Sequence, residues 1–85
     1  MYEIVFSEKA QKQLIKLNKD IQKRIISVFE RIRMRPEAFI DKLVGEPGFK
    51  IRIGDYRAIL DIDYNKLIIF VLKVGHRKNI YDFRQ

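Results

Sequence analysis

The chain has 85 residues, 18 of them Lys or Arg against 11 Asp or Glu, and its formal net charge is +7. This length suits a single domain over residues 1–85, and the basic charge favours an anionic partner such as nucleic acid or an acidic protein. The sequence has no cysteine and one histidine, which excludes disulfides and thiolate chemistry and argues against a histidine metal cage, so we expect no metal or cofactor. We also expect a cytoplasmic protein, because residues 1–6 lack a signal-peptide pattern and no apolar run approaches the ~20 residues that span a bilayer.

The first half of the chain predicts one strand and two helices. Residues 2–6 alternate as a short strand, and Ser7 is suited to cap the helix that follows. Asn18 or Asp20 begins a second helix, whose apolar stripe has the 3.6-residue period and which ends before Pro36. The short connection predicts an antiparallel helical hairpin lying across a sheet.

The second helix also carries five cations, Lys23, Arg24, Arg31, Arg33 and Arg35. A solvated helix face accounts for them, and a secondary surface for an RNA backbone or a partner protein is the alternative. The next segment, residues 36–48, has no clear period and predicts a loop, with Phe39 and Leu43 packed on the core.

The stretch Phe49–Arg57 predicts a hairpin with an unusual pair of residues. Its first strand alternates polar and apolar residues, and Gly54-Asp55 supplies a two-residue turn. Such a turn sets Arg52 opposite Arg57 in a non-hydrogen-bonded pair, where Cα atoms lie about 4.5 Å apart. Like charges directly opposite each other destabilise a hairpin. Such unfavourable local arrangements are expected mainly at functional sites. We interpret the pair as part of a site for a polyanion.

The segments 56–63 and 66–74 predict a second hairpin. A loop at Tyr64-Asn65 sets Asp63 opposite Lys66, and a register slid to a loop at Asn65-Lys66 leaves the faces unchanged. One face then holds Lys50, Arg52, Arg57 and Phe70, and the face under the helices holds Ile51, Ile53, Ala58 and Leu60. The apolar run 67–72 is typical of a central strand. His76 lies on the basic face only if side chains continue to alternate between the two faces past Gly75, where we expect a bulge.

The segment 73–81 is a second polar cluster. If the last strand is central, this cluster lies beside the start of the strand that carries Arg57, and the two converge on one concave surface. Arginines bind phosphate with two parallel hydrogen bonds, and Tyr81 can stack on a base or donate a proton. Packing at the end of the core is the alternative for Tyr81, and a structural role is the alternative for His76.

The sequences FKIRIGDYR (residues 49–57) and VGHRKNIY (residues 74–81) resemble the RelE/ParE superfamily of type II toxins, specifically its RelE-like branch. The resemblance spans nearly the whole chain. It implies an α+β, microbial-RNase-like fold in which an N-terminal strand and an antiparallel two-helix hairpin pack on a mainly antiparallel sheet. It also implies an mRNA interferase that cuts message in the ribosomal A site. Its partner would be an acidic, RelB-like antitoxin that wraps the toxin in a hetero-oligomer.

By the same resemblance, the catalytic candidates are Lys50, Arg52, Arg57, Arg77 and Tyr81, and the RNA-binding candidates are Lys73, His76 and Lys78. RNA carries its own nucleophile, the 2′-OH, so the protein must align it, stabilise charge on the phosphate and move two protons. We assign the stabilisation of charge on the phosphate to Arg57 and Arg77. This stabilisation is usually the largest single contribution to catalysis. Lys50 is the candidate base, since the arginine at position 52 stands where the best-studied relatives have lysine and is a poor base. One histidine excludes a pair of imidazoles in one chain, so we expect a slow, metal-independent endoribonuclease that needs the ribosome.

Two other functions fit the same pattern. A ParE-like inhibitor of DNA gyrase would share the fold and perform no chemistry, although that branch tends to lack the dense basic set. A non-catalytic nucleic-acid-binding module would use the cations only to neutralise phosphates.

Overall fold

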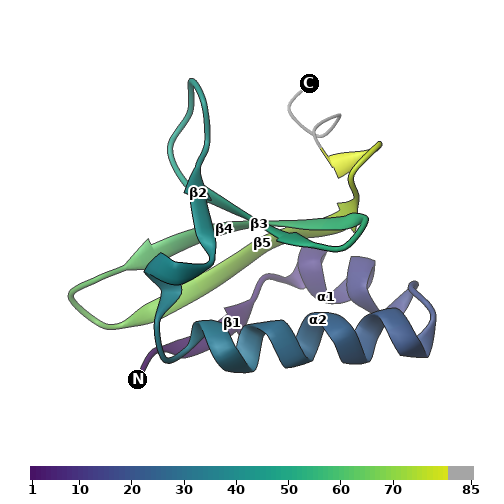
Figure 1. Cartoon of the computed structure of the whole chain (residues 1–85), viewed down its shortest axis with the longest axis horizontal. Helices are drawn as coiled ribbons and strands as arrows, with labels where there is room; N and C mark the ends of the chain where they lie inside the picture. The colour runs from purple at the N-terminus through teal and green to yellow at the C-terminus, as the bar shows by residue number, and fades with distance from the viewer. Residues whose placement is uncertain (81–85) are drawn as a thin grey trace.

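Two helices cover one face of a five-stranded sheet in the computed structural model, which describes residues 1–80 (Figure 1). The sheet order is β1-β5-β4-β3-β2, with β1 parallel to β5 and the other neighbours antiparallel. This confirms the predicted α+β class, the helical hairpin and the central place of the last strand. The elements are β1 (Glu3–Phe6), α1 (Glu8–Ile15), α2 (Lys19–Ile32), the 3₁₀ turn η1 (Pro36–Ala38), β2 (Ile40–Lys42), β3 (Phe49–Ile53), β4 (Tyr56–Asp63) and β5 (Ile68–His76).

Polar side chains begin both helices. The Ser7 Oγ accepts a hydrogen bond from the Ala10 N–H at 3.0 Å, as predicted for α1. The Asn18 Oδ1 accepts one from the Ile21 N–H at 3.0 Å, so Asn18 rather than Asp20 is the N-cap of α2. Both caps satisfy backbone donors that a helix leaves open in its first turn.

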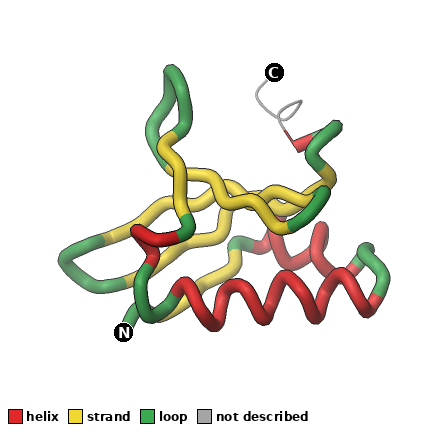
Figure 2. The backbone as a smooth tube through the Cα atoms, in the orientation of Figure 1, coloured by secondary structure: helices red, strands yellow, loops and turns green. Residues whose placement is uncertain are grey.

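The helices form one layer and the sheet another (Figure 2), and the hydrophobic core lies between them. The strands bury the face predicted to lie under the helices, and the helices bury one stripe each. The core residues are Ala10, Ile25, Phe29, Ile32, Ile51, Ile53, Ala58, Leu60, Ile62, Ile69, Val71 and Val74. The opposite face of the sheet carries no α-helix from residues 1–80. The basic residues Lys50, Arg52 and Arg57 lie on that face.

The start of β1 is tied to the end of α2. The Tyr2 N–H donates to the Arg33 carbonyl at 2.9 Å, and the Arg33 Nε donates to the Tyr2 carbonyl at 3.0 Å. Desolvation raises the pKa of the Tyr2 hydroxyl above its ordinary value, and electrostatic interaction with Glu37 and Tyr64 raises it further.

The segment 36–48 is more ordered than predicted. It contains η1 and the edge strand β2, whose Asp41 pairs with Lys50 of β3. A strand of three residues is too short to show a period, which explains why the sequence did not predict it. The prediction that Phe39 packs on the core is wrong, because 38% of Phe39 is exposed and Ile40 packs there instead. Leu43 is half-buried.

The hairpin between β4 and β5 adopts the second of the two registers considered. Asp63 pairs with Ile68, so the predicted pairing of Asp63 with Lys66 is wrong. The Asp63 carboxylate instead accepts hydrogen bonds from the N–H groups of Asn65 and Lys66, both at 3.0 Å, and so closes a longer turn. The two registers differ by an even number of residues, so Phe70 of β5, which pairs with Asp61, lies on the predicted basic face.

A bulge interrupts β5 at Leu72. Ile59 pairs with Lys73 and Leu60 pairs with Val71, so Leu72 has no partner residue in β4. One extra residue exchanges the faces of every residue of β5 that follows it. The bulge expected at Gly75 therefore lies three residues earlier.

Side chains from the N-terminal part of the chain bind the backbone around this bulge. The Ser7 Oγ donates to the Leu72 carbonyl at 3.0 Å, and the Gln13 Oε1 accepts from the Val74 N–H at 2.8 Å. This carbonyl and this N–H do not take part in the pairing of β5 with β4. The neighbour on the other side, β1, has already ended at Phe6, so side chains bind them instead. The bulge is thus built by contacts between segments far apart in the sequence.

Candidate active site

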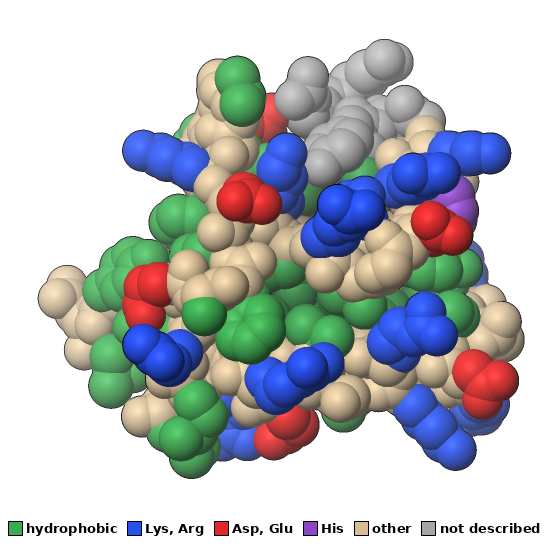
Figure 3. Space-filling view, in the orientation of Figure 1, with side chains coloured by type: hydrophobic (Ala, Val, Ile, Leu, Met, Phe, Trp, Pro, Cys, Tyr) green, Lys and Arg blue, Asp and Glu red, His purple; other side chains and the backbone are tan. Residues whose placement is uncertain are grey.

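A hollow of about 220 Å³ lies on the face of the sheet opposite the helices. Three neighbouring strands, β2, β3 and β4, supply its lining residues, which are Asp41, Lys50, Ile51, Arg52 and Arg57. Lysine and arginine side chains gather over this upper side of the sheet, with a second group along α2 (Figure 3). Three cations against one carboxylate give the hollow a positive charge suited to a phosphate group.

Arg52 and Arg57 lie directly opposite each other, as the two-residue turn predicted. The structure shows how the chain tolerates this like-charge pair. The Arg57 guanidinium turns back along the hairpin, and its Nη1 donates to the Gly54 carbonyl at 2.7 Å and to the Tyr56 carbonyl at 2.8 Å. Two carbonyl dipoles thus offset part of its charge. The other N–H groups of this guanidinium have no hydrogen-bond partner within residues 1–80 and can bind a phosphate oxygen.

The Gly54–Asp55 turn has the geometry that the sequence predicted. Gly54 has φ +60°, while Asp55 is not among the residues with positive φ, which matches a type II′ turn with glycine in its first central position. A Cβ at Gly54 would lie 3.3 Å from the Arg24 Nη1, so a cation of α2 also reaches this turn. Arg33, in contrast, is engaged with Tyr2 and Glu30. The cations of α2 therefore do not act as one group.

Arg77 lies against the same turn. Its N–H donates to the Asp55 carbonyl at 2.8 Å, and its Nε lies 3.8 Å from the Asp55 Oδ1. Arg77 does not line the hollow itself, so the structure places it at the turn beside Arg57 rather than among the strand cations. Its guanidinium is more than half exposed.

The bulge at Leu72 decides where two RNA-binding candidates lie. Lys73 pairs with Ile59, the residue that also faces Lys50, so Lys73 shares the basic face. His76 pairs with Tyr56 and so lies on the opposite face, with the two rings edge to face at 5.4 Å. The condition under which His76 would join the basic face is therefore not met.

His76 holds the loop that carries Arg77. Its Nδ1 accepts a hydrogen bond from the Lys78 N–H at 3.1 Å, and its carbonyl accepts from the Asn79 N–H at 2.9 Å. Lys78 itself is exposed. Ile80 is buried and lies 3.5 Å from where a Cβ of Gly75 would stand. Tyr81 lies outside the described residues, so its role stays a prediction.

Two acidic residues next to these cations were not singled out from the sequence. The sequence did not predict β2, so it gave no signal that Asp41 lies beside these cations. Asp55 was recognised only as a turn residue, although its place between two arginine-bearing segments was visible. No group of three or more potential metal ligands occurs within residues 1–80, and no helix in that range is long and apolar enough to cross a membrane.

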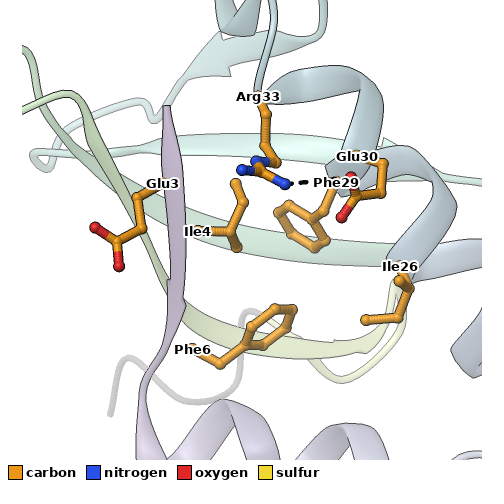
Figure 4. Close-up of a pocket in the computed structure, with 7 residues that line it drawn as sticks. All are labelled: Glu3, Ile4, Phe6, Ile26, Phe29, Glu30 and Arg33. Carbon is orange, nitrogen blue, oxygen red and sulfur yellow. Dashed lines mark hydrogen bonds and ion pairs between the residues drawn. The ribbon is translucent and has the colours of Figure 1, made fainter. Parts of the chain in front are cut away.

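A second hollow of about 290 Å³ lies between β1 and α2 (Figure 4). Apolar side chains form much of its lining, and the Arg33 Nη1 is paired with the Glu30 Oε1 at 3.3 Å. The lining residues are Glu3, Ile4, Phe6, Ile26, Phe29, Glu30 and Arg33. Two carboxylates against one paired cation do not suit a polyanion, so the smaller basic hollow is the candidate active site.

Comparison with known proteins places the chain in a family. Residues 4–81 match the family described as "ParE toxin of type II toxin-antitoxin system, parDE". The mRNA interferase toxin RelE of Escherichia coli is 28% identical over 80 residues, which cover 91% of this chain and 84% of that protein. The toxin–antitoxin complex RelBE2 of Mycobacterium tuberculosis contains a chain with a TM-score of 0.83 and 29% identity, and the match covers 89% of this chain and 98% of that one. For the intact RelBE complex of Escherichia coli the TM-score is 0.78 and the identity 28%, with 89% of this chain and 96% of that one covered. The chain therefore belongs to the ParE toxin family of type II toxin–antitoxin systems, within the RelE/ParE superfamily.

Proposed function

We propose that this toxin is an mRNA interferase, a metal-independent and ribosome-dependent endoribonuclease that cuts message in the A site and stops translation. The observation that carries the proposal is the basic hollow, in which Lys50, Arg52 and Arg57 meet on adjacent strands. Arg77 stands against the turn that holds Arg57. The relatives named as mRNA interferases support the same reaction.

The residues of the hollow supply positive charge, and the RNA supplies the nucleophile. In the proposed step the 2′-oxygen bonds to the scissile phosphorus while the P–O5′ bond breaks. The products are a 2′,3′-cyclic phosphate and a 5′-hydroxyl. Arg57 and Arg77 would stabilise the charge that develops on the phosphate oxygens, which is usually the largest catalytic contribution.

Two protons must move in this step. Lys50 is our candidate for the base that takes the proton of the 2′-OH, because a guanidinium such as that of Arg52 is a poor proton acceptor. Tyr81 is our candidate for the acid that protonates O5′, or for a platform on which a base stacks. The ribosome would complete the geometry by holding the message in an extended form.

We further propose that the cell neutralises this toxin with an acidic antitoxin. Several similar solved structures are complexes of a RelE toxin with a RelB antitoxin. A net charge of +7 would be complemented by an acidic, partly disordered chain that folds on binding and wraps the toxin in a hetero-oligomer. The place of action would be the cytoplasm, where ribosomes and message occur together.

A second candidate function is inhibition of DNA gyrase, which the family's description as a ParE toxin favours. The two candidates differ in what they need from the basic hollow. Cleavage requires Arg57 and Arg77 at the phosphate, whereas a gyrase inhibitor performs no chemistry there.

The test is a cell-free translation reaction supplied with the toxin, followed by mapping of new 5′ ends on translated message. Cuts that disappear with Arg57→Ala and persist with Lys16→Ala, an exposed control at the C-cap of α1, support the nuclease. A parallel supercoiling assay with purified gyrase tests the alternative. Inhibited supercoiling without message cleavage would replace the proposed function with the second candidate.

A further inference from the structure

The Gly54–Asp55 turn is a junction between the two arginines assigned to the phosphate. The Gly54 carbonyl accepts from the Arg57 Nη1, and the Asp55 carbonyl accepts from the Arg77 N–H. The Asp55 carboxylate then lies 3.8 Å from the Arg77 Nε. Arg57 and Arg77 are twenty residues apart in sequence, and these hydrogen bonds hold both to the same two-residue turn.

Aspartate suits the turn itself, but its ion pair with Arg77 adds little to stability and nothing to affinity for RNA. The side chains of Asp55 and Arg77 are 69% and 54% exposed, and exposed ion pairs of this kind add little to folding stability. A negative charge beside a phosphate-binding arginine also repels the RNA. An aspartate here weakens the binding of a polyanion, and the chain nevertheless carries one.

The geometry of the guanidinium gives the aspartate a role. The group is planar with five N–H donors in a fixed fork. The Asp55 carboxylate lies 3.8 Å from Nε, an ion-pair distance, and so favours orientations that turn this edge of the plane toward Asp55. The Nη on the opposite edge of the plane from Nε–H remains available to a phosphate. Arg57 is held by the neighbouring carbonyl of the same turn, which fixes the two arginines relative to each other.

We propose that Asp55 is a positioning residue, which orients the Arg77 guanidinium for the scissile phosphate at a cost in affinity for RNA. The inference rests on the proposed nuclease function and adds a residue to it. It has a signature that a purely structural role lacks, because removal of the charge should change affinity and rate in opposite directions.

The experiment uses the full-length toxin and ribosomes programmed with a defined message. Single-turnover cleavage over a range of toxin concentrations gives the rate at saturation and the half-saturating concentration. For Asp55→Asn we expect the saturated rate to fall roughly tenfold or more, since small misplacements of catalytic groups can cost up to about 100-fold. The half-saturating concentration should stay the same or fall, because a repulsive charge is gone. Asp55→Glu keeps the charge and should recover part of the rate.

A double-mutant cycle separates positioning from other effects. If Asp55 acts through Arg77, then Asp55→Asn should change the rate less than about twofold in a protein that already carries Arg77→Ala. An equal loss in both backgrounds would overturn the inference. A rate unchanged by Asp55→Asn, weaker half-saturation, or a loss that follows a lowered melting temperature would each overturn it as well, and the proposed function would still stand. A wild-type toxin that does not cleave would overturn the proposed function, and with it this inference.

Discussion

Lys50 and Lys73 flank the same residue of β4, Ile59, one from each neighbouring strand. Their Cα atoms are thus about two strand spacings, roughly 10 Å, apart on one face of the sheet. Lys73 reaches this face only because Leu72 forms a bulge, since a regular strand would place residue 72 there. The sheet therefore extends its cationic surface from the hollow, across β4, to the central strand β5.

Replacing Lys73 tests this extension. We expect Lys73→Ala to weaken binding to programmed ribosomes or to RNA, and to reduce the slope of log affinity against log salt by up to about one unit for one lost phosphate contact. Filter-binding titrations at several salt concentrations measure both quantities. Lys16→Ala, at the C-cap of α1, is the matched control, and equal salt slopes for the two variants would place Lys73 outside the RNA surface.

Replacing Arg57 should separate activity from stability. Arg57→Ala removes the like-charge pair with Arg52 but also two hydrogen bonds to turn carbonyls, so the two effects on folding oppose each other. We expect the free energy of unfolding to change by less than about 1 kcal/mol, while cleavage falls by about 100-fold or more. Urea denaturation and 5′-end mapping are the measurements. A protein that keeps its cleavage rate would remove Arg57 from the site.

Replacing His76 distinguishes a positioning role from an RNA contact. His76→Phe keeps an aromatic ring against Tyr56 but removes the acceptor of the Lys78 N–H. We expect a loss of stability of about 0.5–1.5 kcal/mol, the usual size of one hydrogen bond, and an unchanged salt slope of RNA binding. A salt slope lowered by a full unit would instead show that His76 neutralises a phosphate.

Replacing Gln13 tests how the bulge is held. Gln13→Ala leaves the half-buried Val74 N–H without its 2.8 Å acceptor. We expect a cost of about 1–3 kcal/mol in the free energy of unfolding, and faster hydrogen exchange at the amide of Val74. Gln11→Ala, on the same helix, removes an exposed hydrogen bond to the Phe6 carbonyl and should cost less. Equal costs for the two variants would show that the bulge does not depend on Gln13.

The sequence by itself determined the features that depend on a few neighbouring residues. Ser7 and Asn18 were recognisable as caps, and the Gly54-Asp55 turn set the pairing of Arg52 with Arg57. The alternation of β3 and β4 separated the core face from the basic face. These signals are local, because a cap, a turn and a period all act within about one turn of helix or one pair of strand residues.

Only the tertiary structure decided the rest. The edge strand β2 exists because it pairs with β3, and three residues carry no period of their own. The backbone around the bulge at Leu72 is bound by Ser7 and Gln13, which reach β5 from the other end of the chain. That bulge places Lys73 on the basic face and His76 on the core face, whereas a simple alternation would place them the other way round. The contact of Arg77 with Asp55 likewise joins two loops, and contacts between distant segments leave no periodic trace in a single sequence.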